Sequence, residues 1–126
     1  MTFWILAALV LYFVQTLLPV TFRYKGSPEA MKSRDVMPEA TVMYGRADRA
    51  LTNVTEAMIL FLPLALLTID ASGAVLGAAI FVCARIIYVP LYLAGVPFLR
   101  TVAWVAGLGG LLVMAMALTG NYNWNI

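Results

Sequence analysis

Residues 46–69 read RADRALTNVTEAMILFLPLALLTI, and this stretch decides the fold. Its second half, residues 57–69, has no charged side chain, as expected of a helix in the apolar part of a bilayer. A carboxylate and an amide come just before this run, inside a membrane-spanning segment, where polar groups are costly and usually mark a functional site. The polar residues follow a spacing of three, four and three, which places them on one face of an α-helix: Arg46, Arg49, Asn53 and Glu56.

The composition is typical of a membrane protein. Of the 126 residues, 63% are hydrophobic and 11% are charged, whereas soluble domains carry roughly 25% charged residues. The length predicts a single domain over residues 1–126, and the net charge of +2 gives no support to nucleic-acid binding. With one cysteine, Cys83, and no histidine, the chain lacks a Ser-His-Asp or Cys-His catalytic set. The same shortage argues against a zinc site, so no metal is expected.

Four predominantly apolar runs are each long enough to cross ~30 Å of hydrocarbon. The first cation, Arg23, follows the first run, which is typical of a retained helix rather than a signal peptide. A polar loop occupies residues 23–45, and the second helix is predicted to start near Pro38, ahead of the membrane. The sequence predicts an all-α integral membrane protein, a four-transmembrane-helix bundle with spans at about 2–22, 50–69, 74–94 and 98–118.

The cations gather on one side of the predicted bundle. Arg100 lies by the turn before the fourth span on that side, and the opposite side has Asp70 and no cation. By the positive-inside rule, the long loop lies in the cytosol and both termini lie outside it. In a bacterium this predicts the inner membrane. The cations before the second span are Arg23, Lys25, Lys32, Arg34, Arg46 and Arg49.

The second and third spans form a hairpin around a turn signal at residues 70–73, so depth can be counted from its centre. On this count Glu56 and Arg85 differ by two residues, about 3 Å along the helix axis, and are predicted to form an ion pair. Two interpretations of the pair are open: it fixes the register of the helices, or it is part of a site that opens toward the cytosol. One helical turn nearer the cytosol, Asn53 is predicted to lie at about the same depth as Tyr88. A further turn on, Arg49 is predicted to lie at about the depth of Tyr92.

Two blocks of sequence resemble the MAPEG family (membrane-associated proteins in eicosanoid and glutathione metabolism). The first reads RADRALTNVTE over residues 46–56 and continues into FLPL at 61–64. The second reads RIIYVPLYLAG over residues 85–95 and is followed by Arg100 and Trp104. The resemblance covers nearly the whole chain. It implies a homotrimer of four-helix protomers, with glutathione bound between subunits by helices 2–4 near the cytosolic face.

The resemblance also implies roles for single residues. Arg100 matches the arginine that stabilises the glutathione thiolate and is the expected catalytic residue. Arg23 matches a further basic contact. Glutathione as co-substrate implies a transferase or peroxidase that acts on hydrophobic electrophiles in the membrane. The implied ligand contacts on the second and third helices are Arg49, Asn53, Glu56, Tyr88 and Tyr92.

Two other functions stay open at this point. A small proton-coupled transporter would use a membrane carboxylate, here Glu56. Small four-helix exporters carry that carboxylate in the first helix, where this chain has only Gln15. A free, titratable Glu56 would favour transport, whereas a Glu56 bonded to Arg85 would favour the enzyme or a structural role. The third hypothesis is a non-catalytic membrane protein that retains the family fold.

Overall fold

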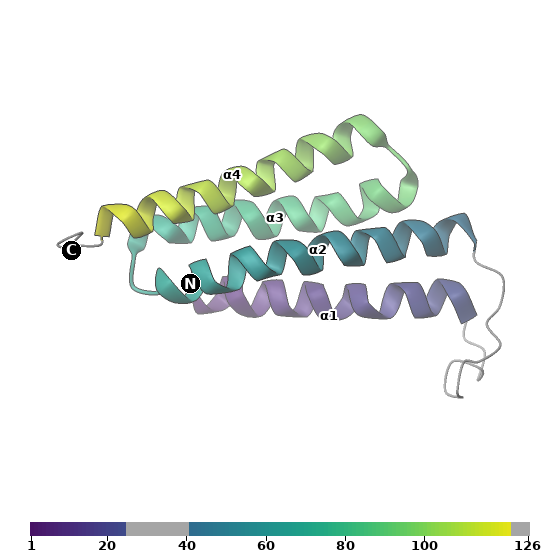
Figure 1. The fold of residues 1–126 in the computed structure, drawn as a ribbon, viewed down its shortest axis with the longest axis horizontal. Helices are drawn as coiled ribbons and strands as arrows, with labels where there is room; N and C mark the ends of the chain where they lie inside the picture. Colours follow the sequence, from purple (N-terminus) through teal and green to yellow (C-terminus); the bar gives the residue numbers. More distant parts are fainter. Residues whose placement is uncertain (25–40, 122–126) are drawn as a thin grey trace.

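Four long helices make up the described part of the chain. The computed structural model describes residues 1–24 and 41–121, and within these ranges it has no strand. Each helix is long and apolar enough to cross a membrane, so the prediction of an all-α bundle with four spans is confirmed. Much of the predicted loop 23–45 lies outside the described residues. Figure 1 labels the helices α1 (Thr2–Tyr24), α2 (Val42–Leu67), α3 (Ser72–Ala94) and α4 (Pro97–Asn121).

Thr41 sets the start of α2. Its backbone is extended, and its hydroxyl accepts a hydrogen bond from the Tyr44 amide at 3.1 Å. This bond satisfies one of the N–H groups that the first turn of a helix leaves free. α2 therefore begins at Val42, whereas the sequence predicted a start near Pro38, which itself lies outside the described residues.

The connection between α2 and α3 occupies residues 68–71. Thr68 is buried, and both its hydroxyl and its backbone N–H donate to the Leu64 carbonyl oxygen, at 2.6 Å and 3.0 Å. The backbone leaves the helical conformation at Thr68, with φ −108° and ψ 20°, and α3 is already helical from Ser72. The turn thus lies two residues nearer the N-terminus than the predicted turn at 70–73, which changes the register of the two helices.

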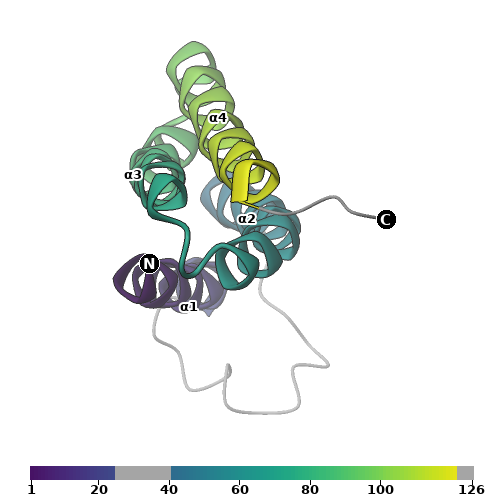
Figure 2. The same ribbon diagram turned by 90° about the vertical axis from the view of Figure 1, so that its left-hand side faces the viewer.

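α3 and α4 pack with their backbones in direct contact. A Cβ atom built on Gly110 would lie 2.6 Å from the Gly77 carbonyl oxygen and 2.7 Å from the Phe81 amide nitrogen. Only glycine fits so close an approach, and small residues are typical of such crossings between membrane helices. Farther along, α4 leans away from α2 toward the α3–α4 turn, as the views in Figures 1 and 2 both show.

A stacked ring pair joins α2 to α3. Phe61 and Phe81 are both buried, with ring centroids 4.5 Å apart and an interplanar angle of 8°. Such a pair contributes about 0.5–1.5 kcal/mol beyond the burial of its area. On the outer surface, by contrast, many large apolar side chains are exposed on all four helices, among them Phe13, Ile59 and Leu112. Exposed apolar surface on this scale is expected where lipid surrounds the helices.

Arg46 ties α2 to the C-terminal end of α3. Its guanidinium donates to the Leu93 carbonyl oxygen at 3.1 Å, at a helix end that leaves carbonyl groups without helical donors. A cation there also interacts favourably with the helix dipole. Gly95 follows with a φ of 74°, and a Cβ atom on it would lie 2.7 Å from the same guanidinium. Arg46 thus fixes the α3–α4 turn, in addition to any role as a membrane anchor.

Replacing Arg46 by alanine is expected to lower the free energy of unfolding by about 1–2 kcal/mol, because the end of α3 loses a charged donor. Thermal unfolding of the purified protein in detergent measures the change. Arg46→Lys keeps the charge but not the planar fork, so it is expected to lose less. Equal melting temperatures for the wild type and Arg46→Ala would contradict this role.

Candidate functional site

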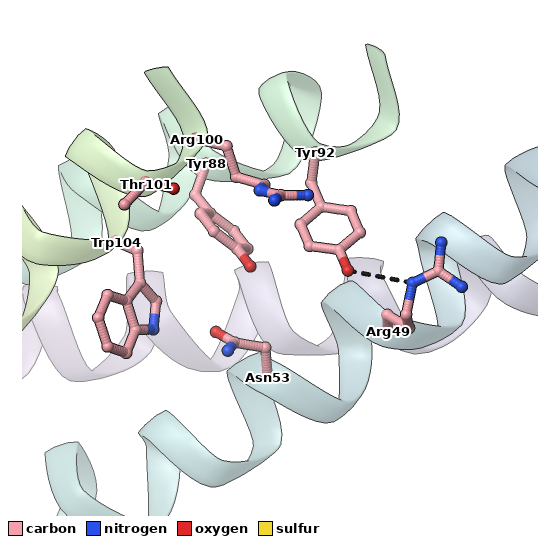
Figure 3. A pocket seen from close by; sticks show the side chains of 7 residues that line it. All are labelled: Arg49, Asn53, Tyr88, Tyr92, Arg100, Thr101 and Trp104. Carbon is pink, nitrogen blue, oxygen red and sulfur yellow. Dashed lines mark hydrogen bonds between the residues drawn. The ribbon is translucent and has the colours of Figure 1, made fainter. Parts of the chain in front are cut away.

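An open cleft lies between α2, α3 and α4 (Figure 3). It is at the end of the bundle where the α4 ribbon leans away from α2 in Figure 1. Its volume is about 240 Å³. Most of the side chains that line it carry hydrogen-bonding groups, and three of them come from the first two turns of α4. We call it the polar cleft, and its lining residues are Arg49, Asn53, Tyr88, Tyr92, Arg100, Thr101 and Trp104.

Each helix supplies the polar cleft from one face. On all three helices, two of the lining residues are four positions apart, so their side chains project one above the other. The predicted site left out two lining residues: Trp104, which entered only through the family resemblance, and Thr101. Its position three residues before Trp104 on α4 is the signal that could have found it. The predicted residues that the structure brings together here are Arg49, Asn53, Tyr88, Tyr92 and Arg100.

Two guanidinium groups and two phenol rings meet at the mouth of the polar cleft. The Arg49 Nε donates to the Tyr92 hydroxyl at 3.2 Å (Figure 3), and the Arg100 guanidinium carbon lies 4.7 Å from the centre of the Tyr92 ring. The Tyr88 and Tyr92 ring centroids are 5.5 Å apart. An arginine has five N–H donors, so both keep donors for a ligand. Because no carboxylate is among the lining residues, the cleft favours an anion.

Arg85 is buried next to Asn53 and Tyr88, two residues of the polar cleft, but does not line the cleft itself. It is only 2% exposed, and its Nη1 donates to the Asn53 amide oxygen at 2.6 Å. The guanidinium also lies over the rings of Tyr88 and Phe81, 5.1 Å and 5.6 Å from their centres. An amide oxygen and two ring faces thus stabilise a buried cation inside a membrane span.

Glu56 is not the partner of Arg85. Within the described residues no ion pair joins them, and the guanidinium bonds to Asn53 instead. Counted from the centre of the observed turn at residues 68–71, Asn53 differs from Arg85 by one residue in depth and Glu56 by two, and the Asn53 amide oxygen lies within hydrogen-bond distance of the guanidinium. The Glu56 side chain is exposed, although it lines a second, smaller cavity together with Arg85. The predicted ion pair is therefore replaced by an arginine–amide hydrogen bond.

Arg23 lies outside the polar cleft. It belongs to the last turn of α1, and its guanidinium carbon is 4.6 Å from the centre of the Tyr44 ring at the start of α2. Within one chain, α1 supplies none of the lining residues. Among the residues that the structure describes, no three carboxylate, cysteine or histidine side chains gather as a metal site would require.

The comparison with family models covers nearly the whole sequence. The model described as the MAPEG family matches residues 1–120 of the chain. The chain belongs to the MAPEG family. No curated protein and no solved structure gives a match. The resemblance carried by residues 46–56 and 85–95 is confirmed, and this MAPEG chain is an integral, multi-pass membrane protein.

Replacing Asn53 by leucine in this MAPEG chain is expected to lower the free energy of unfolding by about 2–3 kcal/mol, because the buried Arg85 loses its acceptor. Thermal unfolding in detergent without added ligand measures the loss. Thr52→Val is the matched control, since the exposed Thr52 hydroxyl bonds only the Asp48 carbonyl of its own helix. A loss no larger than that of Thr52→Val would show that the bond contributes little.

Proposed function

We propose that this protein is a glutathione-dependent transferase or peroxidase that acts on hydrophobic electrophiles. The polar cleft carries the proposal, because two arginines and two tyrosines face one cavity whose lining has no carboxylate. Glutathione has two carboxylates, an α-amine and a thiol, and arginine binds carboxylates through two parallel hydrogen bonds. The family to which the chain belongs includes glutathione transferases and peroxidases, which supports the same ligand.

In this proposal the cleft residues divide between holding the peptide and activating its sulfur. Arg49 and Asn53 on α2 hold the peptide together with Tyr88 and Tyr92 on α3. Arg100 faces the thiol from the first turn of α4, where the helix dipole adds positive potential. A free thiol has a pKa of roughly 8.5, so a nearby cation raises the fraction present as the nucleophilic thiolate at neutral pH.

We infer that neighbouring copies of the chain complete the site, as the homotrimer of the family resemblance implies. The volume of about 240 Å³ is below the roughly 300–1,000 Å³ of typical ligand pockets. Glu56 is exposed and does not line the cleft within one chain, and we propose that it accepts a hydrogen bond from the glutathione amine in the completed site. Arg23 lies at the same end of the bundle but outside the cleft, so we propose that it reaches the ligand from a neighbouring subunit.

The proposed orientation places the cleft at the cytosolic face, with both termini on the other side. The cleft opens at the end of the bundle that carries Arg46, Arg49 and Arg100, which the positive-inside rule assigns to the cytosol. Glutathione would then enter from the cytosol of a bacterium, and a lipophilic electrophile would reach the site through the inner membrane.

Isothermal titration of the detergent-solubilised protein with glutathione tests the proposal. Saturable heat is expected, and it should weaken in Arg49→Ala, which removes a carboxylate partner. A glutathione analogue with a methyl group in place of the thiol should bind about as well but give no ultraviolet thiolate absorbance. No heat above buffer at millimolar glutathione would overturn the proposal. Binding of glutathione without any thiolate absorbance would favour the hypothesis of a non-catalytic membrane protein that retains the family fold.

Proton-coupled transport is a second candidate, and one observation favours it. Glu56 is exposed on α2 and, in the described part of the chain, is not paired with Arg85, and a membrane carboxylate without a cationic partner is typical of proton-coupled sites. In proteoliposomes with an imposed pH gradient, a transporter would pass protons when a lipophilic cation is added, and Glu56→Gln would stop the flux. Absence of flux in the wild type would reject this candidate.

A further inference from the structure

A second cavity continues from the polar cleft toward the middle of the bundle. It has a volume of about 140 Å³ and lies between α2, α3 and α4. Asn53 and Trp104 line both cavities, so the two are neighbours along one groove. We call this second one the inner cavity. Apart from Glu56 and Arg85, its further lining is apolar, made of Ala57, Leu60, Leu108 and Leu111.

Trp104 stands where the groove changes from polar to apolar. Its ring extends from α4 toward α2, and its indole nitrogen is on the side of Asn53 (Figure 3). Arg100, Trp104 and Leu108 follow one another at intervals of four on the same face of α4, so the groove wall passes from cation to indole to aliphatic side chain. The indole is the largest side chain that lines both cavities.

We propose that Trp104 determines the specificity for the hydrophobic co-substrate, by confining its apolar body to the inner cavity. An apolar cavity of roughly 150 Å³ holds one benzene molecule, and the inner cavity is about that size. A single ring or a short alkyl chain fits, whereas a long acyl chain needs the space that the indole fills. This inference rests on the proposed function, since the electrophilic end must meet the glutathione sulfur in the polar cleft.

A 2-alkenal is a suitable test substrate, because its reactive group stays the same while the length of its alkyl chain is varied. The thiol first loses its proton to water. The thiolate sulfur then bonds to the β-carbon, the C=C electron pair shifts to the bond between the α-carbon and the carbonyl carbon, and the C=O electron pair moves onto oxygen, which gives an enolate. The α-carbon finally takes a proton from water, so the net change is addition of the thiol across the double bond, with no other reactant.

The experiment compares kcat/KM for 2-hexenal and 2-dodecenal in the wild type, Trp104→Leu and Trp104→Phe, at one detergent concentration. Dividing each variant's value by the wild type's cancels the partition of the longer aldehyde into micelles. Trp104→Leu is expected to raise the 2-dodecenal to 2-hexenal preference about tenfold, since apolar pockets discriminate chain length by about 10–200-fold. Trp104→Phe, which keeps a ring and most of the packing, should give an intermediate value.

Phe98→Leu is the matched control, because Phe98 is 75% exposed on α4 and lines neither the polar cleft nor the inner cavity. Its preference should equal that of the wild type. Glutathione titration of every variant separates a failure of glutathione binding from a failure of the role proposed for Trp104. If all of them bind glutathione and the preference is the same throughout, Trp104 does not set chain length. If the wild type gives no glutathione heat, the proposed function fails and this inference fails with it.

Discussion

Arg100→Ala is expected to lower kcat for glutathione conjugation about 100-fold, the loss typical of removing one group that stabilises developing or reactive charge at an active site. The guanidinium lines the polar cleft and lies over the Tyr92 ring, which holds it beside the expected position of the sulfur. Without it, the thiol of bound glutathione should titrate nearer to its free pKa of roughly 8.5. The rate of the variant should therefore reach its plateau at a higher pH than that of the wild type.

Two measurements separate loss of activation from loss of binding. Ultraviolet absorbance on adding glutathione reports the thiolate, and isothermal titration reports the peptide. Arg100→Ala should lose most of the thiolate signal while retaining binding through Arg49 and the tyrosines. Arg100→Lys keeps a cation and should retain a larger part of the rate. Unchanged kcat and pH dependence in Arg100→Ala would remove Arg100 from the chemistry and favour the non-catalytic hypothesis.

Gly110→Ala is expected to lower the free energy of unfolding by about 3 kcal/mol, near the upper end of the cost of overpacking a protein interior. The added methyl group would meet the Gly77 carbonyl oxygen at 2.6 Å and the Phe81 amide nitrogen at 2.7 Å, and neither backbone atom can turn aside. α4 would have to shift from α3, and Arg100, Thr101 and Trp104 would move with it. Glutathione affinity should fall together with the melting temperature.

The neighbouring Gly109 provides the control. A Cβ atom built there meets nothing within 4 Å, so Gly109→Ala removes only the helix penalty of glycine, which is roughly 1 kcal/mol. This variant should be as stable as the wild type or slightly more so. The two substitutions, at adjacent glycines, are thus expected to change the free energy of unfolding in different ways. Equal melting temperatures for the two variants would contradict the close packing of α3 on α4.

The sequence was sufficient for features that depend on one helix at a time. Four apolar runs of membrane length predict four spans, and the spacing of Arg49 with Asn53, or of Tyr88 with Tyr92, predicts a shared face because helix geometry is rigid. These faces do line one cleft in the structure. The family resemblance rested on the same blocks, and the match over residues 1–120 agrees with it.

Features that depend on two helices were less predictable. The Glu56–Arg85 pair was counted from a turn at residues 70–73, whereas the observed turn at residues 68–71 brings Asn53 within one residue of Arg85 in depth, and Asn53 accepts the hydrogen bond. Which of two polar side chains on α2 meets the guanidinium depends on how two helices pack, and the spacing within one helix does not specify it.

The spacing of residues in the sequence also did not predict the hydrogen bond of Arg46 or the position of Arg23. Arg46 reaches the Leu93 carbonyl, and Arg23 lies over Tyr44 rather than in the polar cleft. Both were identified from the sequence as cations on one side of the membrane, which is correct for their end of the bundle but does not specify a partner. Any contact between Arg23 and a second subunit depends on a surface that spacing within one chain does not describe.

The bond between Arg85 and Asn53 has a consequence for synthesis on the ribosome. It needs only α2 and α3, so a nascent chain can give this cation its hydrogen-bond acceptor before the last helix has emerged. Arg100, Thr101 and Trp104 arrive only with that last helix. The buried arginine can thus have its acceptor before the cleft exists, and the part of the cleft that one chain supplies forms only when the last helix is inserted.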